Sequence, residues 1–95
     1  MILKGDYIMR KVDLINVISE VLVDYDLEGL ICSGAPKDEY EPEAKDIADF
    51  IVNNRKADVY QLSDNIQKTF LYYFDNFIDI EDCIKVSEDI QAKLV

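Results

Sequence analysis

The chain has 95 residues, enough for one domain whose core needs neither metal ions nor disulfides. Its apolar fraction of 49% is that of a folded protein, so disorder along most of the chain is not expected. The formal net charge of −10 argues against direct binding to nucleic acid or to anionic membranes, since both require clustered Lys and Arg. No apolar run approaches the roughly 20 residues of a membrane span and no secretory signal is visible, so we expect a cytoplasmic protein.

The first predicted element is a helix at about Tyr7 to Asp24, where apolar residues recur at spacings of three and four. Its inner face is expected to comprise Ile8, Val12, Leu14, Ile15, Ile18, Val21 and Leu22. From Tyr25 to Glu41 the helical period fails, because Gly and Pro residues interrupt it. This is a long loop for a small domain, and long ordered loops are often functional.

Three further helices are predicted after the loop. Pro42 suits the first turn of a second helix, which runs to about Asn54. Asp58 and Gln61 resemble a capping box at the start of a third helix. Its inner face should comprise Val59, Leu62, Ile66, Phe70, Tyr73 and Phe77. The last helix should begin near Asp79, with Ile80, Cys83, Ile84, Ser87, Ile90 and Leu94 on its inner face.

These patterns predict the fold class. No strand pattern and no internal repeat are visible. We therefore expect an all-α protein, in which residues 1–95 form a single domain. The predicted architecture is a compact bundle of four amphipathic helices, with one long acidic loop between the first and second helices.

The sequence offers little for catalysis. It contains no histidine, the most usual general base near neutral pH. Cys83 lies beside Glu81 and Asp82, which disfavour a thiolate, so we expect it to pack as a small hydrophobic residue. Cys32 is expected to be partly buried in the loop, and both thiols to stay reduced. The chain is therefore predicted not to be an enzyme and to need no cofactor.

One local pattern resembles half of a calcium-binding loop. Asp24, Asp26 and Glu28 alternate along the chain and are followed by Gly29. The twelfth position of such a loop should hold a bidentate Glu, and here it holds Ala35. We therefore predict no metal site.

The strongest functional signal is a concentration of negative charge. Between Asp24 and Asp49 the chain carries nine acidic residues and two lysines, a formal charge of −7. Because packed like charges destabilise a compact state, this density favours a surface that attracts a basic partner. The predicted partner-binding residues are Tyr25, Asp26, Glu28, Asp38, Glu39, Tyr40, Glu41, Glu43 and Asp46. Two alternatives remain open: the charges form only a solvated face, or both tyrosines fold inward and hold the loop on the bundle.

The same loop resembles the signature of an uncharacterised family of small bacterial all-helical proteins. The signature is roughly Trp-Asp-Pro-Ile-Gly, then Pro-x-Asp-Glu-Tyr, then an amphipathic helix. The matching residues are Asp26, Gly29, Pro36, Asp38, Glu39 and Tyr40, whereas Tyr25, Leu27 and Glu28 depart from the signature. The resemblance implies a compact bacterial helical protein similar to the immunity proteins of interbacterial toxin systems.

These observations favour an immunity protein that neutralises a basic toxin domain, with a nuclease as the favoured toxin. A nuclease must present positive surface to phosphates, and an acidic inhibitor can occupy that surface. The main alternative is a cytosolic protein–protein interaction module without a toxin. Two further hypotheses are a divalent-ion sensor and a nucleic-acid mimic. The mimic requires the same negative charge as the inhibitor, so the sequence does not distinguish these two.

Overall fold

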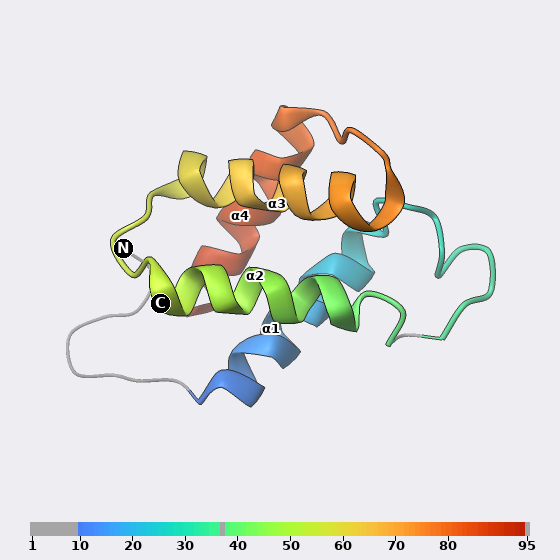
Figure 1. Ribbon diagram of the computed structural model, residues 1–95. Helices are drawn as coiled ribbons and strands as arrows, with labels where there is room; N and C mark the ends of the chain where they lie inside the picture. Colours follow the sequence, from blue (N-terminus) through green and yellow to red (C-terminus); the bar gives the residue numbers. More distant parts are fainter. Residues whose placement is uncertain (1–9, 37, 95) are drawn as a thin grey trace.

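The computed structural model describes residues 10–36 and 38–94, and this part of the chain forms four α-helices without a strand. They are α1 (Lys11–Tyr25), α2 (Glu41–Asn53), α3 (Val59–Phe74) and α4 (Ile80–Leu94). In Figure 1, α1 and α2 run in roughly opposite directions, as do α2 and α3, whereas α4 crosses α3 at a steep angle. Each helix packs against two others, because α1 also contacts α4 and closes the ring. The predicted all-α bundle is confirmed.

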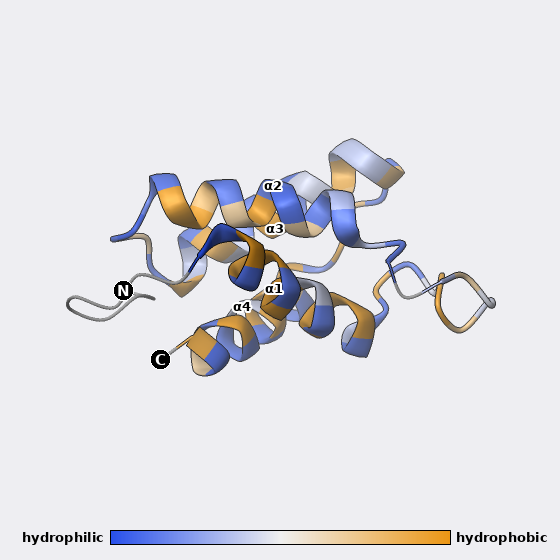
Figure 2. Ribbon diagram, turned by 90° about the horizontal axis from the view of Figure 1, so that it is seen from below, coloured by the Kyte–Doolittle hydropathy of each residue, from blue (hydrophilic) through white to orange (hydrophobic). Residues whose placement is uncertain are grey.

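The core lies between the four inner faces, and hydrophobic and hydrophilic positions alternate along each helix (Figure 2). Its fully buried helical residues include Leu14, Ile18, Val21, Leu22, Ala44, Ile47, Ala48, Ile51, Leu62, Ile66, Phe70, Cys83, Val86 and Ile90. Burying such side chains is the main favourable term in folding. Between α3 and α4 the hydroxyls of Ser63 and Ser87 hydrogen bond at 2.9 Å, so these two buried polar groups satisfy each other.

The predicted inner faces are correct at most positions, and the errors lie at some helix ends and within α4. Val12 is 53% exposed, because α1 begins at Lys11 and its first turn extends past the core. Phe77 is 68% exposed, because α3 ends at Phe74. On α4 the prediction omitted Val86, which is buried, and included Ile84, which is half-buried. Tyr7 and Ile8, predicted for the first helix, lie outside the described residues.

Two aspartates with left-handed backbone end α1 and α3. Asp26 has φ 49° and donates its N–H to Leu22 O, and Asp75 has φ 52° and donates to Leu71 O. Aspartate tolerates this conformation better than most residues because its short side chain can bond locally. The C-terminal ends of α1 and α3, at Asp26 and Asp75, lie at the same end of the bundle. The start of α2 lies there too, and we call this the loop end (Figure 1).

The predicted capping box at the start of α3 is confirmed. Asp58 Oδ1 accepts a hydrogen bond from the Gln61 N–H at 2.9 Å, and Gln61 Oε1 accepts one from the Asp58 N–H at 2.9 Å. Each residue satisfies a donor that the first helical turn leaves free.

Asp58→Ala is expected to lower the free energy of unfolding by about 1 kcal/mol, because it leaves the Gln61 N–H without its acceptor. Urea denaturation followed by circular dichroism at 222 nm measures the change. Asp64→Ala, an exposed position within the same helix, is the matched control and should change stability by less than about 0.5 kcal/mol. Equal losses in the two variants would show that the box contributes nothing specific.

Candidate partner-binding surface

Asp26 organises the start of the α1–α2 loop. Its Oδ1 accepts hydrogen bonds from the Ile31 N–H at 3.0 Å and the Tyr40 hydroxyl at 2.7 Å, and its Oδ2 accepts one from the Cys32 N–H at 3.0 Å. Desolvation by itself would raise the pKa of Asp26, but these hydrogen bonds outweigh it and hold the pKa below its usual value. The carboxylate is therefore committed to the loop itself and is a poor candidate for partner contact.

Tyr40 is completely buried, with 0% of its surface exposed, so the prediction that it touches a partner is wrong for this structure. Its ring centroid lies 6.1 Å from that of Phe70 and 6.3 Å from that of Phe74, both on α3. Its hydroxyl donates to Asp26 and accepts from the Glu28 N–H at 3.0 Å. Burial, followed by the bond to Asp26, raises the pKa of Tyr40 to about 12.

Tyr25 ties the end of α1 to α4. Its hydroxyl donates to Asp89 Oδ2 at 2.8 Å, and this bond, followed by burial, raises the pKa of Tyr25. The side chain is half-buried, so part of it remains at the surface. The alternative in which both tyrosines hold the loop on the bundle thus describes Tyr40 fully and Tyr25 in part.

The burial of Glu43, on α2, was not predicted from the sequence. It was expected at the surface, but it is only 2% exposed. Within residues 10–36 and 38–94, no donor lies within hydrogen-bond distance of its Oε1. Burial raises the pKa of Glu43, and the negative charges of Glu39, Asp46 and Glu28 raise it further. A buried carboxyl with one unpartnered oxygen therefore lies close to other carboxylates.

The remaining predicted acidic residues stay at or near the surface, and we call them the acidic rim: Glu28, Asp38, Glu39, Glu41 and Asp46. They come from the loop and from the first turns of α2, so the fold gathers them at the loop end. Of the ion pairs found in the described part of the chain, only Lys45–Glu41, at 3.5 Å and largely exposed, involves the rim. Such a pair contributes little to stability, so the rim keeps most of its negative charge.

Aromatic side chains from the end of α3 border the acidic rim, and one of them, Tyr73, was predicted from the sequence to lie on the inner face of the helix. The Tyr73 hydroxyl donates to Asp46 Oδ2 at 2.8 Å, and this bond, followed by burial and nearby negative charge, raises the pKa of Tyr73 to about 12. Tyr72 is 81% exposed and meets Tyr73 edge to face, with ring centroids 5.1 Å apart. Just beyond the helix, Asn76 Nδ2 donates to Glu28 Oε2 at 2.7 Å, which links this segment to the loop.

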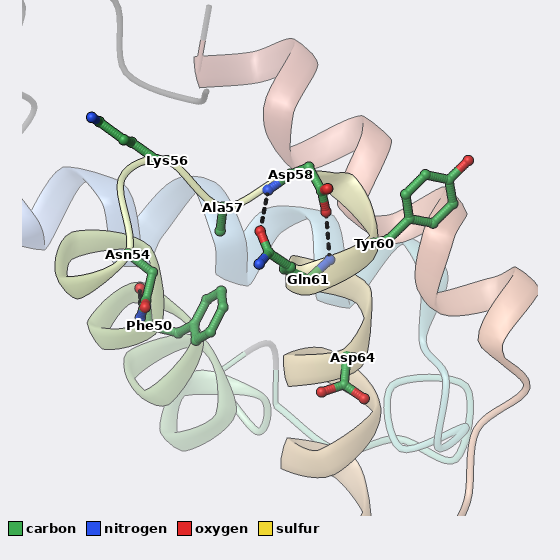
Figure 3. A pocket seen from close by; sticks show the side chains of 8 residues that line it. All are labelled: Phe50, Asn54, Lys56, Ala57, Asp58, Tyr60, Gln61 and Asp64. Atoms are coloured by element: carbon green, nitrogen blue, oxygen red, sulfur yellow. Dashed lines mark hydrogen bonds between the residues drawn. The ribbon is translucent and has the colours of Figure 1, made fainter.

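A separate hollow of about 640 Å³ lies at the other end of α2, between its last turn and the start of α3. Figure 3 shows that Phe50 of α2 and Asn54, which follows the last residue of α2, face Gln61 of α3 across it. Three of its polar side chains already have partners: Asp58 and Gln61 bond each other, and Asn54 Nδ2 donates to Phe50 O at 2.8 Å. The hollow is open and distant from the acidic rim, so we assign it no ligand.

Neither cysteine supports a reactive site. Cys83 is buried as predicted, and burial, with Asp82 and Asp79 nearby, raises its pKa to about 11. Cys32 is exposed, contrary to the expectation of partial burial, because the bond from its N–H to Asp26 fixes its backbone and not its side chain. In residues 10–36 and 38–94, no three His, Cys, Asp or Glu side chains are placed to hold a metal ion. None of the described helices has the length and apolar character needed to cross a membrane.

A family model described as a domain of unknown function, DUF1871, matches residues 33–93. The chain belongs to this family. The DUF1871 match includes Pro36, Asp38, Glu39 and Tyr40 but does not reach Asp26 or Gly29. The predicted membership in an uncharacterised family of small domains is thus confirmed, whereas the full loop signature and the likeness to immunity proteins stay predictions. No curated protein and no solved structure matches the chain significantly.

Proposed function

We propose that this DUF1871 protein binds a basic protein through the acidic rim and acts as the immunity protein of a bacterial toxin system. The proposed partner is a cationic toxin domain, with a nuclease as the favoured type, and the proposed compartment is the cytoplasm. The observation that carries the proposal is the acidic rim itself, which the fold gathers at the loop end and in which only Glu41 has an ion-pair partner among the described residues. A free protein gains nothing from such an arrangement, whereas a complex with a cation does.

Electrostatics support a macromolecular partner over a small ligand. The rim residues lie along the loop and the start of α2, a surface and not an enclosed cavity. Negative charge spread over a surface steers a positively charged protein toward it and raises the association rate. A nuclease active site presents positive charge for phosphates, so the same rim would exclude its substrate.

The alternative is a cytosolic interaction module with no toxin. The exposed aromatic side chains of Tyr72 and Phe77 favour a protein interface of some kind, because aromatic residues are enriched at the centres of interfaces. Both functions use the same end of the bundle. They differ in the identity of the partner.

Co-expression with the product of the adjacent upstream gene tests the proposal. An immunity protein should restore growth of cells that express the C-terminal domain of that product, and the two purified proteins should form a complex on size-exclusion chromatography. Matched cells that carry the empty vector should not recover. An adjacent gene that encodes no toxic domain, or a toxic domain that this protein neither binds nor neutralises, would overturn the immunity function.

A further inference from the structure

Two carboxyl side chains of α2 converge with one aromatic side chain of α3 at the loop end. Glu43 and Asp46 are three residues apart and so lie on the same side of α2. The Tyr73 hydroxyl donates to Asp46, and the charge of Glu43 also acts on Tyr73. The ring of Tyr72 stands edge-on to that of Tyr73. The four side chains therefore form one local cluster.

This cluster lacks a positive charge of its own. Within the described residues, neither Glu43 nor Asp46 takes part in an ion pair, and the Oε1 atom of Glu43 has no hydrogen-bond partner. A buried polar atom without a partner is unusual in a folded protein and calls for an explanation. A cation supplied from outside would satisfy Glu43 and reduce the repulsion from Glu28 and Glu39.

The chemistry of the cluster favours a guanidinium group over other cations. The carboxyls are not arranged to hold a metal ion in the described part of the chain. A guanidinium is planar, bonds two carboxylates through its fork of N–H donors, stacks on aromatic rings, and loses less hydration than an ammonium on burial. Tyr72 and Tyr73 provide the rings and Glu43 and Asp46 the acceptors.

We propose that Glu43, Asp46, Tyr73 and Tyr72 form a binding site for one arginine side chain of a basic protein partner. This inference rests on the proposed function, because it identifies the chemical group of the partner that would be bound beside the acidic rim. Asp46 and Tyr73 are exposed, so a docking arginine meets them first, and its contact with the buried Glu43 requires the side chains around Glu43 to move. Changes of side-chain rotamer at an interface are common when proteins bind.

The site is tested with an octa-arginine peptide and an octa-lysine peptide of equal charge. Isothermal titration calorimetry at low salt should show tighter binding of octa-arginine, by about fivefold or more. Glu43→Gln and Asp46→Asn should each weaken octa-arginine binding by about tenfold, which corresponds to about 1.4 kcal/mol. Glu20→Gln removes the same charge from an exposed position on α1 and should change binding less than twofold.

A stability measurement separates a binding effect from misfolding. Because Glu43→Gln replaces a buried carboxyl, which lies near other carboxylates, with a neutral amide of the same size, the variant should unfold at a higher temperature than the parent protein at pH 7. Weaker peptide binding by a more stable variant supports the site. A variant that unfolds at a lower temperature would show that Glu43 is needed for folding, and would overturn it.

Other outcomes also decide the inference. Equal affinity for octa-arginine and octa-lysine, or equal losses for Glu43→Gln and Glu20→Gln, would show diffuse charge attraction and no arginine site. Those results would leave the proposed function standing, since the rim alone can attract a basic partner. The proposed function falls only in the co-expression experiment, which does not use the peptides.

Discussion

Replacing Tyr40 by Phe is expected to lower the free energy of unfolding by about 2 kcal/mol. The substitution keeps the ring that packs on Phe70 and Phe74 but removes a hydroxyl with two bonds, one to the Asp26 carboxylate and one from the Glu28 N–H. Hydrogen bonds to a charged group are among the stronger ones, and the Glu28 N–H loses its acceptor. Urea denaturation followed by circular dichroism measures the loss.

The matched control is Tyr72→Phe, the same change at an exposed position in the last turn of α3. It should alter stability by less than about 0.5 kcal/mol. Similar stabilities for the parent protein and Tyr40→Phe would show that the bond to Asp26 does not hold the loop. In that case the loop would be fixed by burial of the ring alone.

The loss of unfolding free energy caused by Tyr40→Phe should also depend on pH, because the substitution removes a hydrogen bond to the Asp26 carboxylate. The folded-state pKa of Asp26 is lowered, so its carboxylate stabilises the fold at pH values above the unfolded pKa of about 4. That contribution is lost as the pH falls through the folded-state pKa. The difference in stability between the parent protein and the variant should therefore shrink below about pH 4.

Neutralising the outer part of the acidic rim is expected to slow association with the proposed partner, a basic toxin domain, about tenfold at low ionic strength. The variant combines Asp38→Asn, Glu39→Gln and Glu41→Gln, which leaves the proposed arginine site intact. Electrostatic steering acts on the encounter, so the association rate should change more than the dissociation rate. Stopped-flow fluorescence with a labelled toxin domain measures both, and the difference should diminish as salt is raised toward 0.5 M.

A control with the same change in net charge isolates the position of the charges. Glu20→Gln, Asp64→Asn and Glu88→Gln together remove three carboxylates from exposed positions on α1, α3 and α4. This variant should associate at close to the parent rate. If it slows association as much as the rim variant, the partner responds to net charge and the rim has no special role.

The sequence predicted the helices well because their apolar periodicity and their end signals agree. The α2 stripe from Ala44 to Ile51 is buried as expected, and the capping box at Asp58 forms. The error at Phe77 falls where periodicity continues beyond a helix end. Phe77 is in phase with the α3 stripe, but the left-handed backbone of Asp75 has already ended the helix. Nothing in a hydrophobic pattern locates that stop.

The surface was predicted less completely, because a count of charges does not say which way a side chain points. Tyr40 and Glu43 belong to the same acidic stretch as Asp38 and Glu39, yet they turn inward and the other two turn outward. One signal was available: Glu43, Ile47 and Ile51 are four residues apart, so Glu43 falls on the apolar stripe of α2. The packing of Tyr40 on Phe70 and Phe74 joins residues distant in sequence, and no local pattern indicates it.

The different surroundings of the two thiols make selective chemical labelling possible. Cys32 is exposed in the loop, whereas Cys83 is buried in the core with a pKa of about 11. A maleimide dye at neutral pH should therefore attach to Cys32 without mutation of the native chain. Positioned in the α1–α2 loop, two residues before Gly34, that dye would report by its fluorescence when another molecule binds at the loop end.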